Sequence, residues 1–345
     1  MITTTKIYSI ELLRFISSLM VVIWHYQHFF FPFNTNSSLA FFDIDNYFIS
    51  LIENTKLGFH GVYIFFCISG IVFSITYLNK KKITFKKFMA KRFARLYPLH
   101  FLTLITVLVV QNINLNYSNN YEIYFLNDIK HFLLNIFLIS GWGFEDGHSF
   151  NAPIWSVSVE ILVYIIFFIF MTQLNIYKYI LPLGILIICL VVRKIYFENY
   201  ILHALILFFS GVILSRLYLD KKKSILLILS ILFLPLSFFG TYKIFLMCIG
   251  LCSMFLFIES AFNLSKKIKL IFLNLGNLTY ASYLIHIPLQ LLIILIFNIS
   301  NINLIIFREP LVFFLFIVIV YFFSYYIFLY FEKPINIYIK KILTA

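Results

Sequence analysis

The sequence predicts an all-α protein, a polytopic membrane bundle of about ten transmembrane helices. Of its 345 residues, 62% are hydrophobic and only 12% are charged, whereas a soluble domain is about half apolar and a quarter charged. Apolar runs near the ~20 residues that cross a bilayer as a helix recur along the chain. The basic residues gather in short segments between these runs. The net charge of +13 therefore indicates membrane topology rather than nucleic-acid binding.

The first predicted span, residues 10–31, carries Arg14 near one end and His25 near the other. Ionisable groups are costly in hydrocarbon and usually face a bundle interior or a wet cavity. The spacing between the two residues is about three helical turns, so both side chains lie on one face, about 16 Å apart along the axis. This helix therefore offers a polar track through most of a membrane. The alternative is a snorkelling arginine and a packed histidine.

Nine further apolar segments complete the predicted bundle. They are residues 58–78, 98–110, 154–171, 179–192, 200–219, 224–239, 244–259, 275–297 and 310–331. The longest non-spanning piece, 111–153, contains an apolar stretch at 131–139 that is too short to cross, so we expect a re-entrant or interfacial element there. No second domain is indicated, and we expect residues 1–345 to form a single integral-membrane domain.

Lysine and arginine residues define the predicted inner side. They cluster at 79–95, 220–223 and 266–269, and cytoplasmic loops collect such residues. Both termini are then cytoplasmic, and the acidic loop 34–57 lies outside. The basic pair at 193–194 falls on the outer side and is the exception. The first apolar run is too long for a cleavable signal peptide and no small-residue cleavage site follows it, so we expect a retained helix.

The cysteines all lie inside apolar stretches, where we expect them to be buried small hydrophobes. Two of them, Cys248 and Cys252, share a helix face, but a metal site needs more ligands than two. We therefore expect no metal. The other two cysteines are Cys67 and Cys189.

Six polar clusters in or beside the spans, taken together, resemble the integral-membrane acyltransferase-3 family, whose members O-acylate sugars. The clusters are, in chain order, Arg14-x10-His25 after ELLRF, the GVYIFFCISG of residues 61–70, the FMAKRFARLYP of 88–98 with its RxxR, the WSVSVE of 155–160, the GNLTYASYLIHIP of 276–288, and the E-x-P of Glu332 and Pro334. The resemblance covers nearly the whole chain. Tyr63 stands where the family often has Asp, and Thr279 where it usually has Ser.

The resemblance implies transfer of an acyl group, usually acetyl from acetyl-CoA, to a hydroxyl of a cell-surface glycan. It also places Arg92 and Arg95 in the donor site. These residues stand three apart on one helix face at the predicted inner rim, and guanidinium groups suit the phosphate oxygens of the anionic donor. The alternative is plain positive-inside topology, which explains the neighbouring lysines well and the RxxR spacing less well.

The same resemblance suggests catalytic roles for His25, Glu160 and Arg14. The imidazole of His25 can take a proton from an attacking hydroxyl, or it can carry the acyl group as an acyl-imidazole. Glu160 would orient His25 or raise its basicity, and its alternative role is a buried acid paired with a tyrosine or with Arg14. Arg14 would hold the pantetheine arm or the thioester.

Three further residues are possible members of the site. Trp155 and Ser158 would line the acceptor rim, although Trp155 could equally be an interfacial anchor. His286, midway along its span, is either a second site residue or a hydrogen-bonded core histidine. The remaining histidines match no motif and are expected to be structural or loop residues; they are His28, His60, His131, His148 and His203.

Two other functions compete with acyl transfer. A transporter or flippase for a glycan or lipid intermediate would also use ionisable residues inside the membrane, but no internal repeat of the kind common in transporters is visible. A glycan polymerase would call for a larger outer loop than 111–153. If the protein is an acyltransferase, we expect a bacterial plasma-membrane protein with no bound cofactor. Acyl-CoA would be the donor substrate, and a lipid-linked or surface saccharide would be the acceptor. The sequence does not choose among O-antigen, capsule and related glycans.

Overall fold

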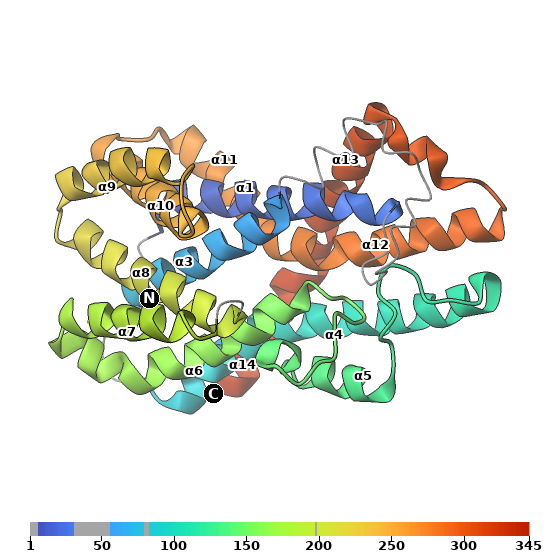
Figure 1. Ribbon diagram of the computed structural model, residues 1–345, viewed down its shortest axis with the longest axis horizontal. Coiled ribbons are helices and arrows are strands. Elements are labelled where there is room, and N and C mark those ends of the chain that lie inside the picture. The colour runs from blue at the N-terminus through green and yellow to red at the C-terminus, as the bar shows by residue number, and fades with distance from the viewer. Residues whose placement is uncertain (1–5, 31–55, 79–82, 197–198, 345) are drawn as a thin grey trace. The chain divides into compact units, whose positions relative to one another are not determined.

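The computed structural model describes residues 6–30, 56–78, 83–196 and 199–344, and within these ranges the regular structure is helical, with no strand (Figure 1). In the same ranges, eight helical segments are long and apolar enough to cross a membrane, and two shorter apolar helices lie at Ile180–Arg193 and Lys223–Leu236. Together they correspond to the ten predicted spans, so the all-α polytopic bundle is confirmed. The predicted outer acidic loop and the lysines at 80–82 lie outside the described residues.

The helices are α1 (Tyr8–His25), η1 (Tyr26–Phe29), α3 (Leu57–Tyr77), α4 (Phe85–Ser118), α5 (Ile129–Ile136), η2 (Ser140–Trp142), α6 (Ile154–Ile176), α7 (Ile180–Arg193), α8 (Tyr200–Leu219), α9 (Lys223–Leu236), α10 (Lys243–Ala261), α11 (Lys266–Asn277), α12 (Thr279–Ile299), η3 (Leu304–Arg308), α13 (Pro310–Ile327), η4 (Phe328–Glu332) and α14 (Lys333–Thr344).

The predicted bounds of several spans are wrong. The ninth predicted span, 275–297, lies within the helical segment Lys266–Ile299, so the basic stretch 266–269 is helix rather than loop, and the tenth, 310–331, lies within Pro310–Leu343. The first α-helix ends at His25, and a 3-10 turn follows it. The third span is not short, because α4 begins at Phe85 and takes in most of the basic segment that we expected to be a loop. Thr84 caps its start by accepting a hydrogen bond from the Lys87 N–H at 3.4 Å. Thirty-four residues make a helix of about 51 Å, so α4 exceeds the ~30 Å hydrocarbon core and its charged first turns extend beyond it.

The chain divides into two compact units, each assembled from three separate segments. The first unit contains residues 1–19, 59–82 and 159–277; the second contains 20–58, 83–158 and 278–345. The divisions fall inside α1, α3 and α6, just before α4 and at the α11–α12 junction. The units are therefore interleaved along the chain rather than arranged one after the other. The prediction of a single domain stays a prediction.

In the first unit, α8 packs against α7, α9 and α10. Close approach of α3 to α8 depends on two glycines: an added Cβ on Gly70 would lie 1.9 Å from the Phe208 carbonyl oxygen, and one on Gly211 would lie 2.0 Å from the Cys67 carbonyl oxygen. Small residues at such crossings let membrane helices pack backbone to backbone. All four cysteines are free and buried, as predicted.

The basic residue Arg193, an exception to the predicted topology, is buried in the first unit. It ends α7, and its Nε donates to His203 Nε2 at 3.1 Å. Its guanidinium lies over the rings of Tyr242 and Phe245, 5.2 and 5.0 Å from their centroids. Because the guanidinium is held by imidazole and aromatic rings, Arg193 is not a loop charge and carries no weight as a topology signal.

In the second unit, α12 lies beside both α4 and α13, and α4 also packs against α5 and α14 (Figure 1). An apolar core joins α4, α5, α12 and α13 to the end of α1 and to η1. Phe29 stacks on Phe307 with ring centroids 4.0 Å apart. The Tyr26 hydroxyl donates to the Phe307 carbonyl at 2.7 Å. These contacts hold η1, which directly follows His25, against η3.

Candidate active site

Two histidines from distant parts of the chain meet in the second unit. The rings of His25, the last residue of α1, and His286, in the middle of α12, have centroids 4.8 Å apart. His286 is fully buried and His25 is 8% exposed. The rings of Trp24 and His28 also lie against His25, at 4.8 and 5.3 Å. The structure therefore places the predicted residues His25 and His286 in one site.

Each of the two imidazoles presents its Nε2 as a base. His25 Nδ1 lies 2.8 Å from the Val21 carbonyl, and His286 Nδ1 lies 3.0 Å from the Ser282 carbonyl. A carbonyl oxygen can only accept, so Nδ1 carries the proton in both rings and Nε2 of the neutral ring keeps its lone pair. His286 Nε2 is buried and has no hydrogen-bond partner among the described residues. This nitrogen is therefore an acceptor that a proton donor of a bound substrate could pair with.

Two buried amides hold the backbone around this pair. Gln290 Nε2 donates to the carbonyls of His25 and Tyr26, at 3.2 and 3.4 Å. These carbonyls lie where α1 changes into a 3-10 turn, and Gln290 gives them a side-chain partner in addition to the bonds of the turn. Asn151 Nδ2 donates to the Leu284 carbonyl at 2.9 Å, two residues before His286. Gln290 thus fixes the end of the helix that carries His25, and Asn151 ties the segment preceding α6 to α12.

The start of α6 is attached to the same region of α12. The Tyr283 hydroxyl donates to the Pro153 carbonyl at 2.8 Å and lies 2.6 Å from the Ser156 hydroxyl. Ser156 belongs to the WSVSVE cluster of residues 155–160, the W-S-x-S-x-E motif, and Tyr283 to the GNLTYASYLIHIP cluster of residues 276–288, the late motif. These two motifs form one hydrogen-bonded junction. The junction packs next to His286, whose ring centroid is 6.2 Å from that of Tyr283.

The two residues predicted for the acceptor rim, Trp155 and Ser158, are both buried. Ser158 Oγ accepts from the Gly141 N–H at 2.9 Å, and its carbonyl accepts from Trp142 Nε1 at 2.9 Å. Ser158 therefore anchors η2 to α6. A role of either residue in acceptor binding stays a prediction.

Sequence reasoning missed three polar side chains beside the histidine pair. The Tyr124 hydroxyl lies 3.3 Å from His28 Nε2, and the rings of Tyr124 and His148 have centroids 6.3 Å apart. Burial raises the pKa of Tyr124, which keeps its hydroxyl protonated, and lowers the pKa of His148 to about 4, which keeps its ring neutral. Tyr124 and His148 lie in loops outside any motif. In the sequence, only the three-residue spacing of His28 from His25 indicated that a further polar side chain would lie beside the histidine pair.

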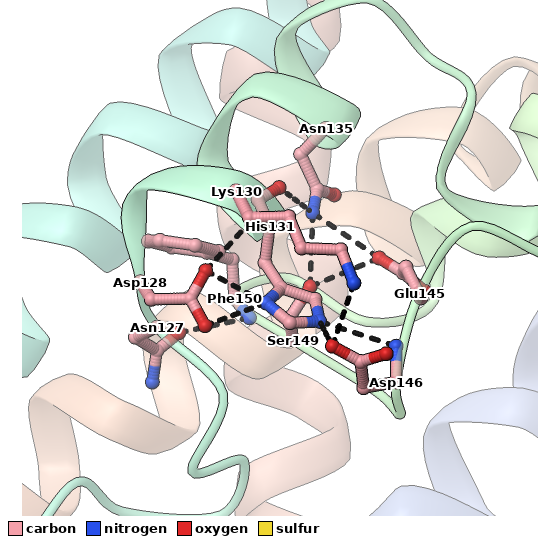
Figure 2. A network of polar contacts seen from close by, with 9 residues as sticks. All are labelled: Asn127, Asp128, Lys130, His131, Asn135, Glu145, Asp146, Ser149 and Phe150. Atoms are coloured by element: carbon pink, nitrogen blue, oxygen red, sulfur yellow. Dashed lines mark hydrogen bonds and ion pairs between the residues drawn. The ribbon is translucent and has the colours of Figure 1, made fainter.

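A polar network braces the loop between α5 and α6 (Figure 2). The first part of the predicted non-spanning element at 131–139 belongs to the short helix α5. Asp128 caps this helix: its carboxylate accepts from the His131 N–H at 2.9 Å and from His131 Nδ1 at 2.8 Å. Figure 2 shows the imidazole between this carboxylate and the loop at Asp146, whose N–H donates to His131 Nε2 at 3.3 Å. Lys130 closes the ring of contacts by donating to Asp146 at 2.6 Å.

Glu145 is the half-buried acid of this network. Its Oε1 accepts from Ser149 Oγ at 3.0 Å and from Asn135 Nδ2 at 3.5 Å (Figure 2). Burial raises the pKa of Glu145 to about 7, and the hydrogen bonds only partly oppose that effect. The network fixes residues 145–149, which lead directly to Asn151 and the histidine pair.

The other predicted catalytic residues lie in the first unit. The Ser69 hydroxyl donates to Glu160 Oε1, so the GVYIFFCISG motif and the W-S-x-S-x-E motif meet through these side chains. Arg14 forms an ion pair with Glu11 at 2.8 Å. A Cβ added to Gly276 would lie 2.2 Å from Glu11 Oε2, so this glycine of the late motif leaves room for the pair.

Arg14 and His25 both belong to α1, as predicted. Glu160 belongs to the first unit and His25 to the second. The orientation of His25 by Glu160 stays a prediction, as does contact of Arg14 with the thioester.

The predicted donor-binding arginines are partly buried on α4. Arg92 and Arg95 lie on the stripe that includes the buried residues Phe88 and Leu99, which is the packed face of the helix. The carbonyl of Leu96 accepts from the Tyr280 hydroxyl at 2.5 Å. The RxxR element is therefore attached directly to the start of α12, the helix that carries His286.

Comparison with known proteins identifies the class to which this fold and site belong. The family model described as an acyltransferase domain, that of the acyltransferase-3 proteins, matches residues 7–329. The chain belongs to the acyltransferase-3 family. No curated protein and no solved structure matches the chain. The family and the apolar helices together define a multi-pass membrane acyltransferase.

Proposed function

We propose that the protein is a membrane O-acyltransferase that moves an acetyl group from cytoplasmic acetyl-CoA to a hydroxyl of a cell-surface glycan, such as O-antigen, capsule or a related saccharide. The observation that carries this proposal is the buried imidazole pair. His25 and His286 lie 4.8 Å apart, centroid to centroid, and each offers an unprotonated Nε2. Acyl transfer to a hydroxyl needs a base of this kind at the reacting oxygen.

In the direct route, His25 Nε2 takes the proton of the acceptor hydroxyl as its oxygen attacks the thioester carbonyl carbon. The carbon–sulfur bond breaks, and the imidazolium returns the proton to the departing thiolate. In the covalent route, Nε2 of His25 attacks the thioester carbonyl carbon first, the carbon–sulfur bond breaks, and the coenzyme A thiolate leaves an acyl-imidazolium on His25. The acceptor hydroxyl then attacks the acyl-imidazole while the neighbouring His286 takes its proton. The arrangement of two bases side by side supports either route.

The donor must meet the cationic end of α4 for this chemistry. The proposed topology places both chain termini and the RxxR element in the cytoplasm and the protein in a bacterial plasma membrane. Reporter fusions after Asp146 and Lys222 test this topology. A reporter at Lys222 that responds from outside would overturn the proposed order of spans between Ile154 and Leu219.

The test of function is transfer of labelled acetyl by purified protein in lipid nanodiscs. The protein is supplied with [14C]acetyl-CoA and membrane fractions containing the surface glycans of the producing cell, and the label in ester linkage to glycan is counted. In cells, deletion of the gene should remove ester-linked acetyl from the surface glycans, as measured by mass spectrometry. Labelled acetyl trapped on the wild-type protein but not on His25→Ala would select the covalent route. No transfer in both settings would overturn the proposal.

A further inference from the structure

A proline lies inside α12, the helix that carries His286. Pro288 stands two residues beyond His286, and the helix continues past it to Ile299. Proline has no backbone N–H, so the carbonyl four residues before it, that of Leu284, loses the hydrogen bond that a helix normally supplies. Leu284 and Pro288 are both buried. A buried carbonyl without its donor is costly, most of all in a membrane, so another group has to replace the missing N–H.

Asn151 supplies the missing donor from outside the helix. Its Nδ2 donates to the Leu284 carbonyl at 2.9 Å. Asn151 is fully buried, and its Oδ1 has no hydrogen-bond partner among the described residues. An apolar side chain could fill the same space but could not donate, so the contact with Leu284 explains why an amide stands here. Membrane helices tolerate proline when a neighbouring segment satisfies the freed carbonyl in this way.

The segment that carries Asn151 is itself held on both sides. On one side, Asn127 Oδ1 accepts from the Phe150 N–H at 2.9 Å, which attaches the segment to the loop between α4 and α5 (Figure 2). On the other side, the Tyr283 hydroxyl donates to the Pro153 carbonyl at 2.8 Å, which attaches it to α12. The backbone of Asn151 is therefore fixed by contacts other than its own side chain, and the amide meets Leu284 from a firm support.

The hydrogen bond from Asn151 falls on the turn that orients His286. The Nδ1 of His286 lies 3.0 Å from the carbonyl of Ser282, at the start of this turn, and Leu284 lies between the two residues. Helices kink at proline, whose ring crowds the carbonyl four residues before it. Loss of the donor at Leu284 would let this turn open further and would move His286 relative to His25, from which its ring centroid is 4.8 Å away.

We propose that Asn151 is a positioning residue for acyl transfer, because it replaces the hydrogen bond lost at Pro288 and so holds His286 beside His25. The proposal rests on the proposed function, since it concerns the imidazole pair in that reaction. Asn151 acts through the Leu284 carbonyl and not on the donor. Its loss should therefore lower kcat and leave donor affinity unchanged.

The experiment is a double-mutant cycle between Asn151 and Pro288 on the full-length protein in nanodiscs, with [14C]acetyl-CoA and glycan-containing membrane fractions. Asn151→Leu and Asn151→Ala both remove the donor; the first keeps the branched shape and the second leaves room. Either should lower kcat about tenfold to a hundredfold, since a displacement of about 1 Å can cost ~10²-fold, at an unchanged Kd for acetyl-CoA. Pro288→Ala returns an N–H that can donate to the Leu284 carbonyl. In that background, the loss of kcat from either variant should shrink to about twofold.

Asn127→Leu is the matched control. It removes another amide of the same region, which contacts the Phe150 N–H and the Tyr124 carbonyl at 2.9 and 2.7 Å. Neither contact involves α12, so the effect of Asn127→Leu on kcat should be the same with and without Pro288→Ala. Thermal unfolding of the same proteins gives a second cycle. The variants of Asn151 should lower the unfolding temperature more in the wild-type background than in the Pro288→Ala background.

The outcomes separate this inference from the proposed function. If wild-type protein transfers acetyl and the Asn151 variants lose the same fraction of kcat in both backgrounds, the inference is wrong and the proposed function stands. Coupling in thermal unfolding with an unchanged kcat would make Asn151 a structural residue only, which also overturns the inference. If Pro288→Ala alone abolishes transfer, additive unfolding temperatures overturn the inference, and coupled ones with a lowered kcat in Asn151→Ala support it. If wild-type protein transfers no acetyl, both proposals fail.

Discussion

Replacement of Gln290 by methionine should impair catalysis more than donor binding. Gln290 donates to two buried carbonyls, those of His25 and Tyr26, at 3.2 and 3.4 Å. Methionine nearly conserves the volume of glutamine but has no donor, so both carbonyls lose their side-chain hydrogen bond. Each lost hydrogen bond contributes ~0.5–1.5 kcal/mol, so the free energy of unfolding should fall by about 1–3 kcal/mol. Gln290 is a positioning residue, because it acts on the reaction only through the backbone of His25.

Loss of the two hydrogen bonds from Gln290 loosens the end of α1 and the ring of His25. A displacement of the reacting group by about 1 Å can cost ~10²-fold in rate, so kcat for acetyl transfer should fall about tenfold to a hundredfold in Gln290→Met. The Kd for acetyl-CoA should stay within twofold. Steady-state transfer assays and donor titrations on the same nanodisc preparation measure the two quantities.

A matched control separates positioning from general stability. Asn298→Leu removes another amide of α12, whose Nδ2 donates to Glu122 Oε1 at 3.1 Å and to Asn114 Oδ1 at 3.5 Å. This variant should lose comparable stability while kcat stays within about twofold. If Gln290→Met keeps wild-type kcat, or if Asn298→Leu loses as much, then the contact of Gln290 with the end of α1 does not position His25.

Three further predictions follow from the site and the helix crossings. His25→Ala should abolish acetyl transfer in the covalent route, or lower it ~10²–10⁴-fold as a lost general base, with normal membrane insertion; near-normal transfer would move the chemistry to His286. Glu145 has its pKa raised to about 7 in the folded protein, above the ordinary 4.5, so ionisation of this acid destabilises the folded protein as the pH rises from about 4.5 through 7. The stability of Glu145→Gln minus that of wild type, measured by thermal unfolding, should therefore be larger at pH 8 than at pH 5. An equal difference at both pH values would contradict this. Gly70→Ala forces a Cβ to within 1.9 Å of the Phe208 carbonyl oxygen, so it should lower the yield of folded protein severely by size-exclusion chromatography, and a normal elution profile would count against the close crossing.

The helices and the family were determined by the sequence alone, because both depend on local patterns. Apolar runs of bilayer length predict each span wherever they occur, and the six motifs indicated the acyltransferase-3 family from their order along the chain. Local patterns set helix ends less well. The prediction missed the end of α1 at His25 and the start of α4 at Phe85, since an amphipathic basic segment such as 85–95 extends a helix beyond the apolar run that reveals it.

The composition of the site was decided by tertiary packing. The sequence left His286 open between site residue and core residue. The packing of α12 places it beside His25, with ring centroids 4.8 Å apart, and its role in the reaction stays a prediction. Gln290 and Asn151 carry no motif, and their roles depend on backbone carbonyls that only the packed helices bring within reach. Residues so far apart in sequence share no periodicity that could signal their contact. Their meeting is set by the packing of α12 against the end of α1 and the start of α6, where buried polar groups must find partners.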